Sequence, residues 1–280
     1  MSTPLSFAVI GHPVAHSRSP QIHAAFARQF GIDLTYDRID AEPSEFESTV
    51  EAFFNEGGSG LNVTVPFKER AWQMAAANLS ERAQDAGAVN TLWQHDGVLH
   101  GCNTDGIGLV MDLRRLNMPL DGAKLLIAGA GGAARGVLGP LLAAGVAHIT
   151  VVNRTAERAQ DLISHWVASH PQDQTKLAWS SYDQASELIG CELIINATSS
   201  SLQGEPLPIP ATLFGPSVCA YDMMYGKEPT AFMRQAKDGG CLHVADGLGM
   251  LVGQASESFH IWHGQRPNIE PVVTQLRAQL

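Results

Sequence analysis

A glycine-rich turn between two apolar runs constrains the fold of this chain more than any other feature. Residues 125–128 (Leu-Leu-Ile-Ala) read as a buried strand, and residues 129–134 (Gly-Ala-Gly-Gly-Ala-Ala) follow as G-x-G-x-x-A. A helix through Leu142 and a second strand at residues 149–152 complete a strand–turn–helix–strand unit. The glycines permit the tight turn and let the backbone approach a pyrophosphate, which the N–H groups of the following helix attract. The unit therefore predicts a dinucleotide-binding domain.

The end of the second strand indicates which dinucleotide is bound. An acidic residue there would accept hydrogen bonds from a ribose 2′-hydroxyl, but the chain has Asn153-Arg154-Thr155, with Arg158 one turn later. Two guanidiniums and a hydroxyl suit a 2′-phosphate, because each arginine can donate paired, charge-assisted hydrogen bonds. We therefore predict NADP rather than NAD as the cofactor. The alternative is that both arginines are solvated side chains at the start of a helix.

Two further apolar runs read as strands of the same sheet. They are residues 193–195 and 218–221, and each is followed by residues that could line the nicotinamide side of the cofactor. The first run ends in residues 196–199 (Asn-Ala-Thr-Ser) and the second in residues 222–225 (Asp-Met-Met-Tyr). On spacing alone, the side chains at 223–225 could equally belong to a core.

The first hundred residues also alternate predicted strands with predicted helices. Such alternation favours a mainly parallel sheet with helices on its faces, in which ligands bind at the carboxyl ends of the strands. A tight turn at Asp96-Gly97 predicts a hairpin after this region. The strands are expected at residues 7–11, 34–40, 61–65, 89–93 and 98–101, and the helices at residues 21–30, 43–54 and 69–77.

The stretch from Asn62 to Lys68 reads as a short strand that ends abruptly and then presents a lysine. Alternation puts its apolar residues on one face and the polar side chains of Asn62 and Thr64 on the other. Pro66 cannot donate to a sheet ladder and holds Val65 extended, so the strand is expected to end there. A strand end with converging polar groups and a lysine is a plausible place for chemistry. It could also be an ordinary strand followed by a surface lysine.

Two serines precede the first predicted helix. Ser19 followed by Pro20 matches an N-cap with proline at the first helical position, which would be a purely structural role. Ser17 has no such role, yet both hydroxyls lie beside a helix N-terminus, where free N–H groups suit a carboxylate. Asp105 precedes a later predicted helix and could merely cap it.

Composition limits the classes of partner. At 280 residues, with 45% hydrophobic content, the chain suggests one large domain or two moderate ones with a full core. The net charge of −10 makes nucleic acid and anionic membrane surfaces poor partners, so an anionic ligand would need local positive groups. No signal peptide or membrane span is expected, because the start lacks a long apolar run and residues 125–147 contain six glycines, a proline and an arginine.

No metal or redox site is predicted. The four cysteines lack paired spacing, so free thiols in a reducing compartment, and hence a cytoplasmic location, are expected. His260 and His263 lie three apart on a predicted helix without a nearby carboxylate or cysteine in sequence. They are expected to pack rather than to bind zinc.

Taken together, the motifs of this chain resemble a known family throughout its length, the shikimate dehydrogenases. Nine stretches in the family's order carry the resemblance, which makes it far more specific than any one motif. They are residues 11–20, 62–68, 87–91, 103–106, 129–135, 153–155, 196–199, 221–225 and 247–251.

The resemblance implies a reversible, NADPH-dependent reduction of 3-dehydroshikimate to shikimate, on the route to chorismate and aromatic amino acids. It implies an α/β substrate domain with a mainly parallel sheet at residues 1–104 and 248–280. A Rossmann-type NADP domain would span residues 105–247, with a cleft between the two domains. The expected partners are the small-molecule substrate and cofactor, and the chain would act as a monomer or homodimer.

The resemblance also assigns residues to roles. Lys68 and Asp105 would be the catalytic pair. Lys68 would protonate the developing alkoxide, and Asp105 would hold Lys68 in place and accept a hydrogen bond from a substrate hydroxyl. An adjacent carboxylate favours a charged lysine, whereas burial disfavours it. The substrate would contact Ser17, Ser19, Asn62, Thr64, Asn90, Asp105, Tyr225 and Gln254. The cofactor would contact Glu81, Gly129, Ala130, Gly131, Gly132, Ala133, Asn153, Arg154, Thr155, Arg158, Thr198, Met223, Gly247 and Met250.

One residue departs from the family pattern. Ser201 stands where the family commonly has glycine after the Asn-Ala-Thr-Ser run, which concerns the shape of one loop. Two alternative functions compete with that of a shikimate dehydrogenase. A quinate/shikimate dehydrogenase of the same fold would accept a wider range of substrates, although the paired serines favour shikimate. A non-catalytic NADP-binding regulator would not need both Lys68 and Asp105.

Overall fold

The computed structural model describes residues 5–184 and 190–280 of the chain. The chain divides into two compact units. The first unit comprises Met1–Gly108 and Val252–Leu276, and the second comprises Leu109–Leu251 and Arg277–Leu280. Each unit has its own sheet and is described separately below.

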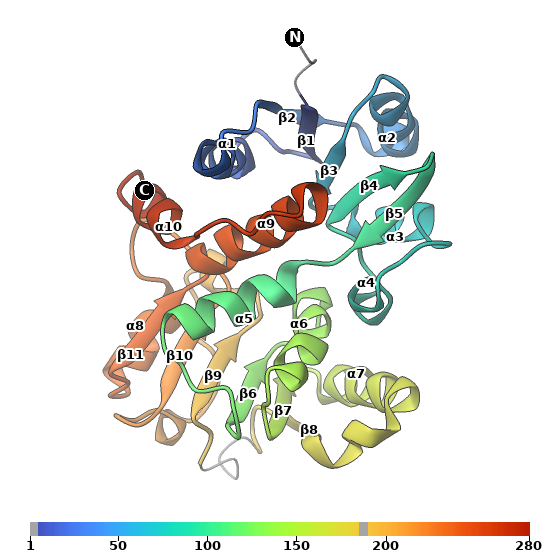
Figure 1. Ribbon diagram of the computed structural model, residues 1–280. Helices are drawn as coiled ribbons and strands as arrows, with labels where there is room; N and C mark the ends of the chain where they lie inside the picture. Colours follow the sequence, from blue (N-terminus) through green and yellow to red (C-terminus); the bar gives the residue numbers. More distant parts are fainter. Residues whose placement is uncertain (1–4, 185–189) are drawn as a thin grey trace. The chain divides into compact units, whose positions relative to one another are not determined.

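The first unit contains a mixed sheet with the order β2-β1-β3-β4-β5 (Figure 1). Strands β1, β2 and β3 are parallel, and β4 is antiparallel to both β3 and β5. Four of these five strands thus run the same way, as the prediction of a mainly parallel sheet requires. The elements are β1 (Leu5–Gly11), α1 (Ser19–Phe30), β2 (Leu34–Asp40), η1 (Pro43–Glu45), α2 (Phe46–Asn55), β3 (Gly60–Val63), α3 (Lys68–Met74), α4 (Glu81–Ala86), β4 (Thr91–His95) and β5 (Val98–Cys102).

Three more helices belong partly to the first unit. Helix α5 (Asp105–Arg115) begins in it, and most of α9 (Leu248–His263) and α10 (Glu270–Arg277) belongs to it. His263 of α9 packs its ring against Phe7 and Phe259, with ring centroids 5.0 and 4.3 Å apart. The prediction that this histidine packs in the fold is thereby confirmed.

The strand that contains Asn62 is shorter than predicted. β3 ends at Val63, so Thr64 and Val65 lie beyond it, and Val65 is 64% exposed. The predicted last residue of this strand, Val65, is therefore wrong by two residues. The ladder with β4 ends at the pair Asn62–Thr91, and Val63 adds one more bond on that side, from its N–H to the Asn90 carbonyl at 2.9 Å. Both faces of β3 are buried, because it is a central strand.

The second unit contains a six-stranded parallel sheet with the order β8-β7-β6-β9-β10-β11. This order, 3-2-1-4-5-6 along the chain, is that of the doubly wound dinucleotide-binding fold and confirms the Rossmann-type prediction. The elements are β6 (Lys124–Ala128), α6 (Gly132–Ala143), β7 (His148–Asn153), α7 (Ala156–Ser169), η2 (Pro171–Lys176), β8 (Leu177–Ser181), β9 (Leu193–Asn196), η4 (Ser200–Gln203), η5 (Ala211–Leu213), β10 (Cys219–Asp222), α8 (Ala231–Asp238) and β11 (His243–Asp246).

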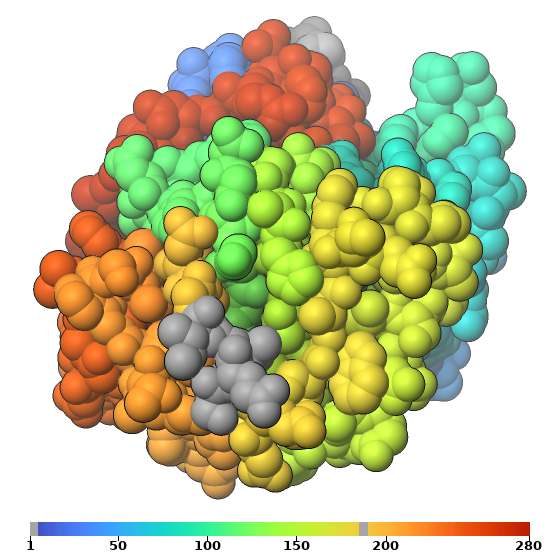
Figure 2. Space-filling view, turned by 90° about the horizontal axis from the view of Figure 1, so that it is seen from below, coloured from blue at the N-terminus to red at the C-terminus, as the bar shows by residue number. Residues whose placement is uncertain are grey.

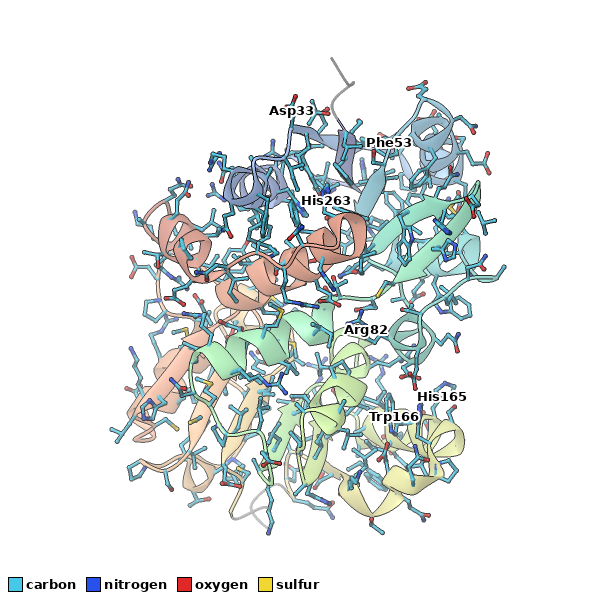
Figure 3. The ribbon with its side chains drawn as sticks, viewed as in Figure 1. Asp33, Phe53, Arg82, His165, Trp166 and His263 are labelled. Carbon is cyan, nitrogen blue, oxygen red and sulfur yellow. The ribbon has the colours of Figure 1, made fainter. Side chains whose placement is uncertain are left out.

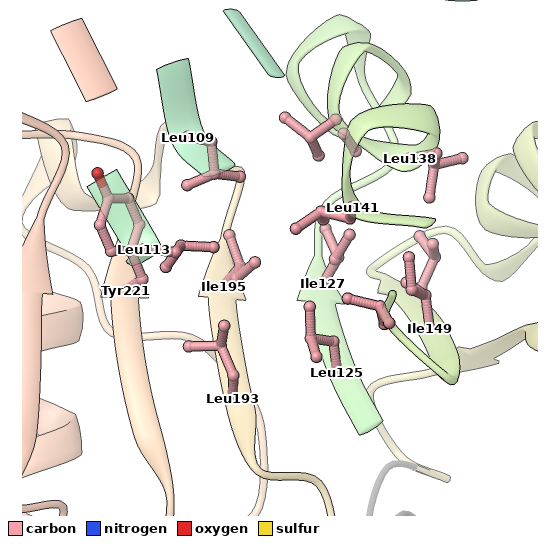
Figure 4. Packing of buried hydrophobic residues seen from close by; sticks show 14 of the residues in the cluster. Leu109, Leu113, Leu125, Ile127, Leu138, Leu141, Ile149, Leu193, Ile195 and Tyr221 are labelled. Atoms are coloured by element: carbon pink, nitrogen blue, oxygen red, sulfur yellow. The ribbon is translucent and has the colours of Figure 1, made fainter. Parts of the chain in front are cut away.

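The two faces of this sheet carry separate apolar clusters. On one face, leucines and isoleucines of β6, β7 and β9 pack against α5 and α6, as the close-up in Figure 4 shows. On the other face, Phe214 and Phe232 lie in a cluster with residues of β6, β9 and β10. Burial on both faces explains why the central strands read as continuous apolar runs in the sequence. The segment from β7 to β8 forms part of the surface seen in Figure 2, where it is yellow-green to yellow.

Within residues 5–184 and 190–280, the helices are all too short or too polar to pass through a bilayer. All four cysteines are free thiols, and Cys102, Cys219 and Cys241 are buried. Burial raises the pKa of Cys191 to about 11, so this thiol is a poor nucleophile near neutral pH.

Candidate active site

Lys68 and Asp105, which are 37 residues apart, form an ion pair in the first unit. The lysine Nζ lies 2.6 Å from Asp105 Oδ2, and their side chains are 29% and 25% exposed. Lys68 is the first residue of α3 and Asp105 is the first residue of α5. The pair is therefore held at two helix starts and remains partly open to solvent, which a group that exchanges protons with a ligand requires.

Asn90 holds the other oxygen of this aspartate. Its Nδ2 donates to Asp105 Oδ1 at 2.8 Å and to Thr104 Oγ1 at 2.9 Å, while its Oδ1 accepts from the Thr104 backbone N–H at 3.0 Å. Asn90 is only 2% exposed, so its amide orientation is fixed by these bonds. Both carboxylate oxygens of Asp105 thus accept hydrogen bonds from side chains outside α5.

Asn62 lies in a second group of hydrogen bonds on β3. Its Nδ2 donates to Ser258 Oγ of α9 at 3.0 Å and to the Asn90 carbonyl at 3.1 Å. Its Oδ1 accepts from the Tyr36 hydroxyl at 2.7 Å. Because the donors of this amide are already used, a substrate hydroxyl could still reach only the remaining lone pair of Oδ1.

Ser17 and Ser19 lie together before and at the start of α1. The Ser17 hydroxyl donates to Ser19 Oγ at 3.2 Å, and the Ser19 N–H donates to Ser17 Oγ at 3.3 Å. The predicted N-cap role of Ser19 is wrong, because α1 begins at Ser19 itself and Arg18 occupies the cap position without a side-chain cap bond. Proline is tolerated throughout the first turn, so Pro20 did not fix the start to one residue.

The other predicted substrate ligands of this unit lie nearby or on the same elements. Gln254 of α9 brings its Oε1 to 3.5 Å from both Asn90 Nδ2 and Thr104 Oγ1. Thr64 follows β3, and its methyl group packs so close to Gly11 that a Cβ there would come within 2.4 Å. Glu81, a predicted cofactor ligand, is the exposed first residue of α4. Tyr225 belongs to the second unit, in the loop after β10.

The glycine-rich turn occupies the carboxyl end of β6 in the second unit. Gly129 has a φ of +110°, which favours glycine, and a Cβ there would crowd the Ala197 carbonyl at 3.1 Å. Around Gly131 and Gly132 the space is open, and α6 starts at Gly132 without a side-chain cap bond. The N–H groups of this helix start, next to Ala130 and Ala133, are therefore available to an anionic group.

The neighbouring strand β7 ends at Asn153 and is followed by exposed Arg154, Thr155 and Arg158. Asn153 Nδ2 donates to the Thr155 carbonyl at 2.8 Å, which folds the turn before α7. Arg154 lies close enough to Tyr182 to lower its pKa, although burial has the larger effect and raises it. Two cationic groups and a hydroxyl thus lie at the strand end next to the glycine-rich turn.

The remaining predicted cofactor residues follow β9, β10 and β11. Thr198 donates its hydroxyl to Asn196 Oδ1 at 2.7 Å, and the Met223 N–H donates to the Asn196 carbonyl at 3.0 Å. Gly247 lies so close to Met223 that a Cβ there would come within 2.1 Å of its carbonyl oxygen. Met250 is partly buried on the first turn of α9. These residues all lie at the carboxyl end of the sheet, where ligands of this fold bind.

Ser201, the departure from the family pattern, is part of a buried polar group. Its hydroxyl donates to Asp222 Oδ2 at 2.5 Å and accepts from Asn196 Nδ2 at 3.3 Å. Asp222 also accepts from Thr230 Oγ1 at 2.6 Å. Burial raises the pKa of Asp222, and the hydrogen bonds from Ser201, Thr230 and Asn196 oppose this rise. The hydroxyl thus ties the loop after β9 to the end of β10.

Sequence reasoning missed Tyr36 and Arg38, which contact predicted substrate ligands from β2. Tyr36 bonds to Asn62, and Arg38 donates two hydrogen bonds to the Ser17 carbonyl, at 2.7 and 3.0 Å. The alternation of the strand Leu34–Asp40 would have placed both residues on one face. It gave no signal of what that face contacts.

Comparison with known proteins supplies the family. Family models match residues 9–92 (shikimate dehydrogenase substrate binding domain), 112–203 (shikimate/quinate 5-dehydrogenase) and 247–277 (shikimate 5′-dehydrogenase C-terminal domain). A shikimate dehydrogenase (NADP(+)) from Bordetella petrii is 59% identical over 98% of this chain and 96% of its own length. The chain belongs to the shikimate dehydrogenase family.

Solved structures of shikimate dehydrogenases share the fold. The enzyme from Thermus thermophilus, in complex with NADP(H) and shikimate, has a TM-score of 0.85 and 35% identity, over 99% of this chain and 100% of that one. A 5-ketofructose reductase from Gluconobacter, in its ligand-free form, is also similar, with a TM-score of 0.86 and 27% identity over 99% of each chain. The fold of the shikimate dehydrogenase family is therefore also found in a reductase of another name.

Proposed function

We propose that this member of the shikimate dehydrogenase family catalyses the reversible, NADPH-dependent reduction of 3-dehydroshikimate to shikimate. The observation that carries the proposal is the Lys68–Asp105 pair, 2.6 Å apart, with Asn90, Thr104 and Gln254 hydrogen-bonded around it. Residues 1–104 and 248–280 would bind the substrate, and residues 105–247 would bind the cofactor.

Lys68 is the proposed general acid. Reduction of a ketone leaves a negative charge on oxygen, which an ammonium group can neutralise by donating a proton, and the reverse transfer serves oxidation. Asp105 holds the Nζ through Oδ2, and Asn90 fixes the carboxylate through Oδ1, so the direction of the lysine is set by two bonds. The chain thereby supplies position and a proton for a reaction at one carbon atom.

The substrate carries a carboxylate and several hydroxyl groups, and the first unit offers a group suited to each. Ser17 and Ser19 present paired hydroxyls beside the start of α1, where helix N–H groups favour a carboxylate. Asn62, Thr64 and Gln254, together with Asp105 and Asn90, would contact the ring hydroxyls. Tyr225 would be a further ligand from the second unit.

The residues of the second unit suit NADP. The open space at Gly131 and Gly132 and the uncapped start of α6 fit a pyrophosphate, while Arg154, Thr155 and Arg158 fit a 2′-phosphate. Ala130, Ala133, Asn153, Thr198, Met223, Gly247 and Met250, with Gly129 and Glu81, complete the proposed cofactor ligands. When bound, NADPH supplies the hydride.

A side-by-side assay tests the proposal. The purified protein is given NADP⁺ with shikimate or with quinate, or NADPH with 5-ketofructose, and NADPH absorbance is followed. Oxidation of shikimate with a much higher kcat/KM than the other two substrates supports the proposal. Comparable use of quinate would favour the alternative hypothesis, a quinate/shikimate dehydrogenase. No turnover with any substrate, despite NADPH binding, would favour a non-catalytic regulator.

Replacing the lysine tests the catalytic assignment. Lys68→Ala should lower kcat by about 10²–10⁴-fold, the usual range for general acid–base catalysis, and leave the KM for shikimate nearly unchanged. Lys237→Ala removes an exposed lysine of α8 and serves as the matched control, with unchanged kinetics expected. A Lys68→Ala enzyme that keeps most of its turnover would eliminate Lys68 as the proton donor.

A further inference from the structure

One face of the edge strand β2 holds the predicted substrate-binding residues in place. Tyr36, Arg38 and Asp40 are spaced two apart, so their side chains leave the strand on the same side. Tyr36 donates to Asn62 Oδ1, Arg38 donates to the Ser17 carbonyl, and Asp40 Oδ1 lies 2.7 Å from His12 Nδ1. All three contacts fix residues at or beyond the carboxyl ends of β1 and β3.

Arg38 makes the most constrained of these contacts. Its Nε and Nη2 both donate to the same carbonyl oxygen of Ser17, at 3.0 and 2.7 Å. Two bonds from a planar guanidinium to one oxygen fix both the distance and the direction of that peptide group. The Ser17 hydroxyl, which bonds to Ser19, belongs to the same residue. Arg38 therefore helps to hold the residue whose hydroxyl contacts Ser19.

Arg38 also makes these hydrogen bonds to a neutral carbonyl and not to a carboxylate. In the part of the chain that the structure describes, no ion pair of this arginine is found, whereas Lys68 is paired with Asp105. The serine hydroxyls are neutral, and the protein as a whole carries a net charge of −10. An anionic substrate approaching such a protein gains from a local positive charge next to its binding groups.

We propose that Arg38 is a positioning residue for the substrate carboxylate, acting through the Ser17 carbonyl and through its charge. The inference rests on the proposed function and names the group that makes two neutral serines able to hold an anion in an acidic protein. Tyr36 and Asp40 support the same segment from the same strand. Arg38 itself need not touch the substrate, because it acts by holding Ser17 and by placing a positive charge near the serines.

The test compares shikimate with its methyl ester, which lacks the negative charge but keeps the ring hydroxyls. Arg38→Gln should raise the KM for shikimate about 10-fold, equivalent to about 1.4 kcal/mol, with kcat and the KM for NADP⁺ within about twofold. For the ester, the KM as a substrate or the Ki as a competitive inhibitor should change by less than about threefold. Arg38→Lys keeps the charge without the paired bonds, so its KM for shikimate should lie between those of the unmodified protein and of Arg38→Gln.

Arg28→Gln is the matched control, because Arg28 is an exposed arginine on α1 of the same unit. It removes one positive charge from the protein, as Arg38→Gln does, and should leave the constants for shikimate and for the ester unchanged. An unchanged KM for shikimate in Arg38→Gln, or equal losses for shikimate and the ester, would overturn the inference, since a merely structural residue gives equal losses. Absence of shikimate oxidation by the unmodified protein would instead refute the proposed function.

Discussion

A buried carboxylate of α9 offers a demanding test of the energetics of the first unit. Glu257 Oε1 accepts two hydrogen bonds from Arg82 of α4, both at 3.0 Å, and its Oε2 accepts one from Arg266 at 2.6 Å. The side chain is only 8% exposed, and Arg82 is labelled on its helix in Figure 3. The carboxylate thereby links α4, α9 and the segment after α9. The helix that it anchors also carries Gln254 one turn earlier.

Glu257→Gln removes the charge while keeping the shape of the side chain. Breaking a buried ion pair by removing one partner typically costs about 3–5 kcal/mol of unfolding free energy. Here the two arginine side chains are 30% and 50% exposed, so water can partly solvate them, and the glutamine retains one carbonyl acceptor. We therefore expect a loss of about 2–3 kcal/mol, or a Tm lower by about 5–10 °C.

The dependence of this loss on pH has a defined sign. Burial alone would raise the pKa of Glu257, but the hydrogen bonds and charges of Arg266 and Arg82 outweigh it and hold the pKa below its usual value. Such a carboxylate stabilises the folded state above its unfolded pKa, about 4.5, and this contribution is lost as the pH falls through the folded pKa. The difference in unfolding free energy between Glu257→Gln and the unmodified protein should therefore be constant at about pH 6–8 and shrink below about pH 4.5.

Urea unfolding followed by far-UV circular dichroism, at several pH values, measures this difference. Glu51→Gln removes an exposed carboxylate of α2 in the same unit and should change the unfolding free energy by less than about 0.5 kcal/mol. A loss below about 1 kcal/mol at pH 7 in Glu257→Gln would show that the pair contributes little. A loss that stays the same at low pH would show that charge is not its origin.

The sequence predicted the central strands of the second unit better than its edges. β6, β7, β9 and β10 are buried on both faces and therefore read as apolar runs, which located them to within one or two residues. β8 and β11 lie at the two edges of the sheet and were not predicted. Trp179 of β8 is 41% exposed and His243 of β11 is exposed, so neither strand has a continuous apolar run.

The candidate site shows a similar limit. Spacing alone could not bring Lys68 to Asp105, because their contact depends on how β4 and β5 return along β3 between them. The family resemblance joined the two residues, and their roles stay predictions. Tyr36 and Arg38 were not predicted from the sequence, for a related reason. A polar residue on an edge strand usually faces water, and only the path of the chain after β1 brings Ser17 over this strand.

Two further predictions concern the second unit. Arg154→Gln should raise the KM for NADPH about 10-fold or more and leave the weaker use of NADH nearly unchanged, because the side chain is assigned to the 2′-phosphate; equal losses with both cofactors would contradict that assignment. Tyr221→Phe should lower the unfolding free energy by about 1–3 kcal/mol, because the buried Tyr221 hydroxyl donates to Asp112 Oδ2 at 2.7 Å and the variant leaves this oxygen without that donor. Burial already raises the pKa of Asp112, against the hydrogen bonds from Tyr221 and Arg115, so losing one of them raises it further. An acid with a raised folded pKa costs stability as the pH rises above its unfolded value, so the loss in Tyr221→Phe should grow between about pH 4 and pH 7. Thermal unfolding across that range measures it, and a loss that shrinks with rising pH would show that the hydroxyl does not stabilise a charged Asp112.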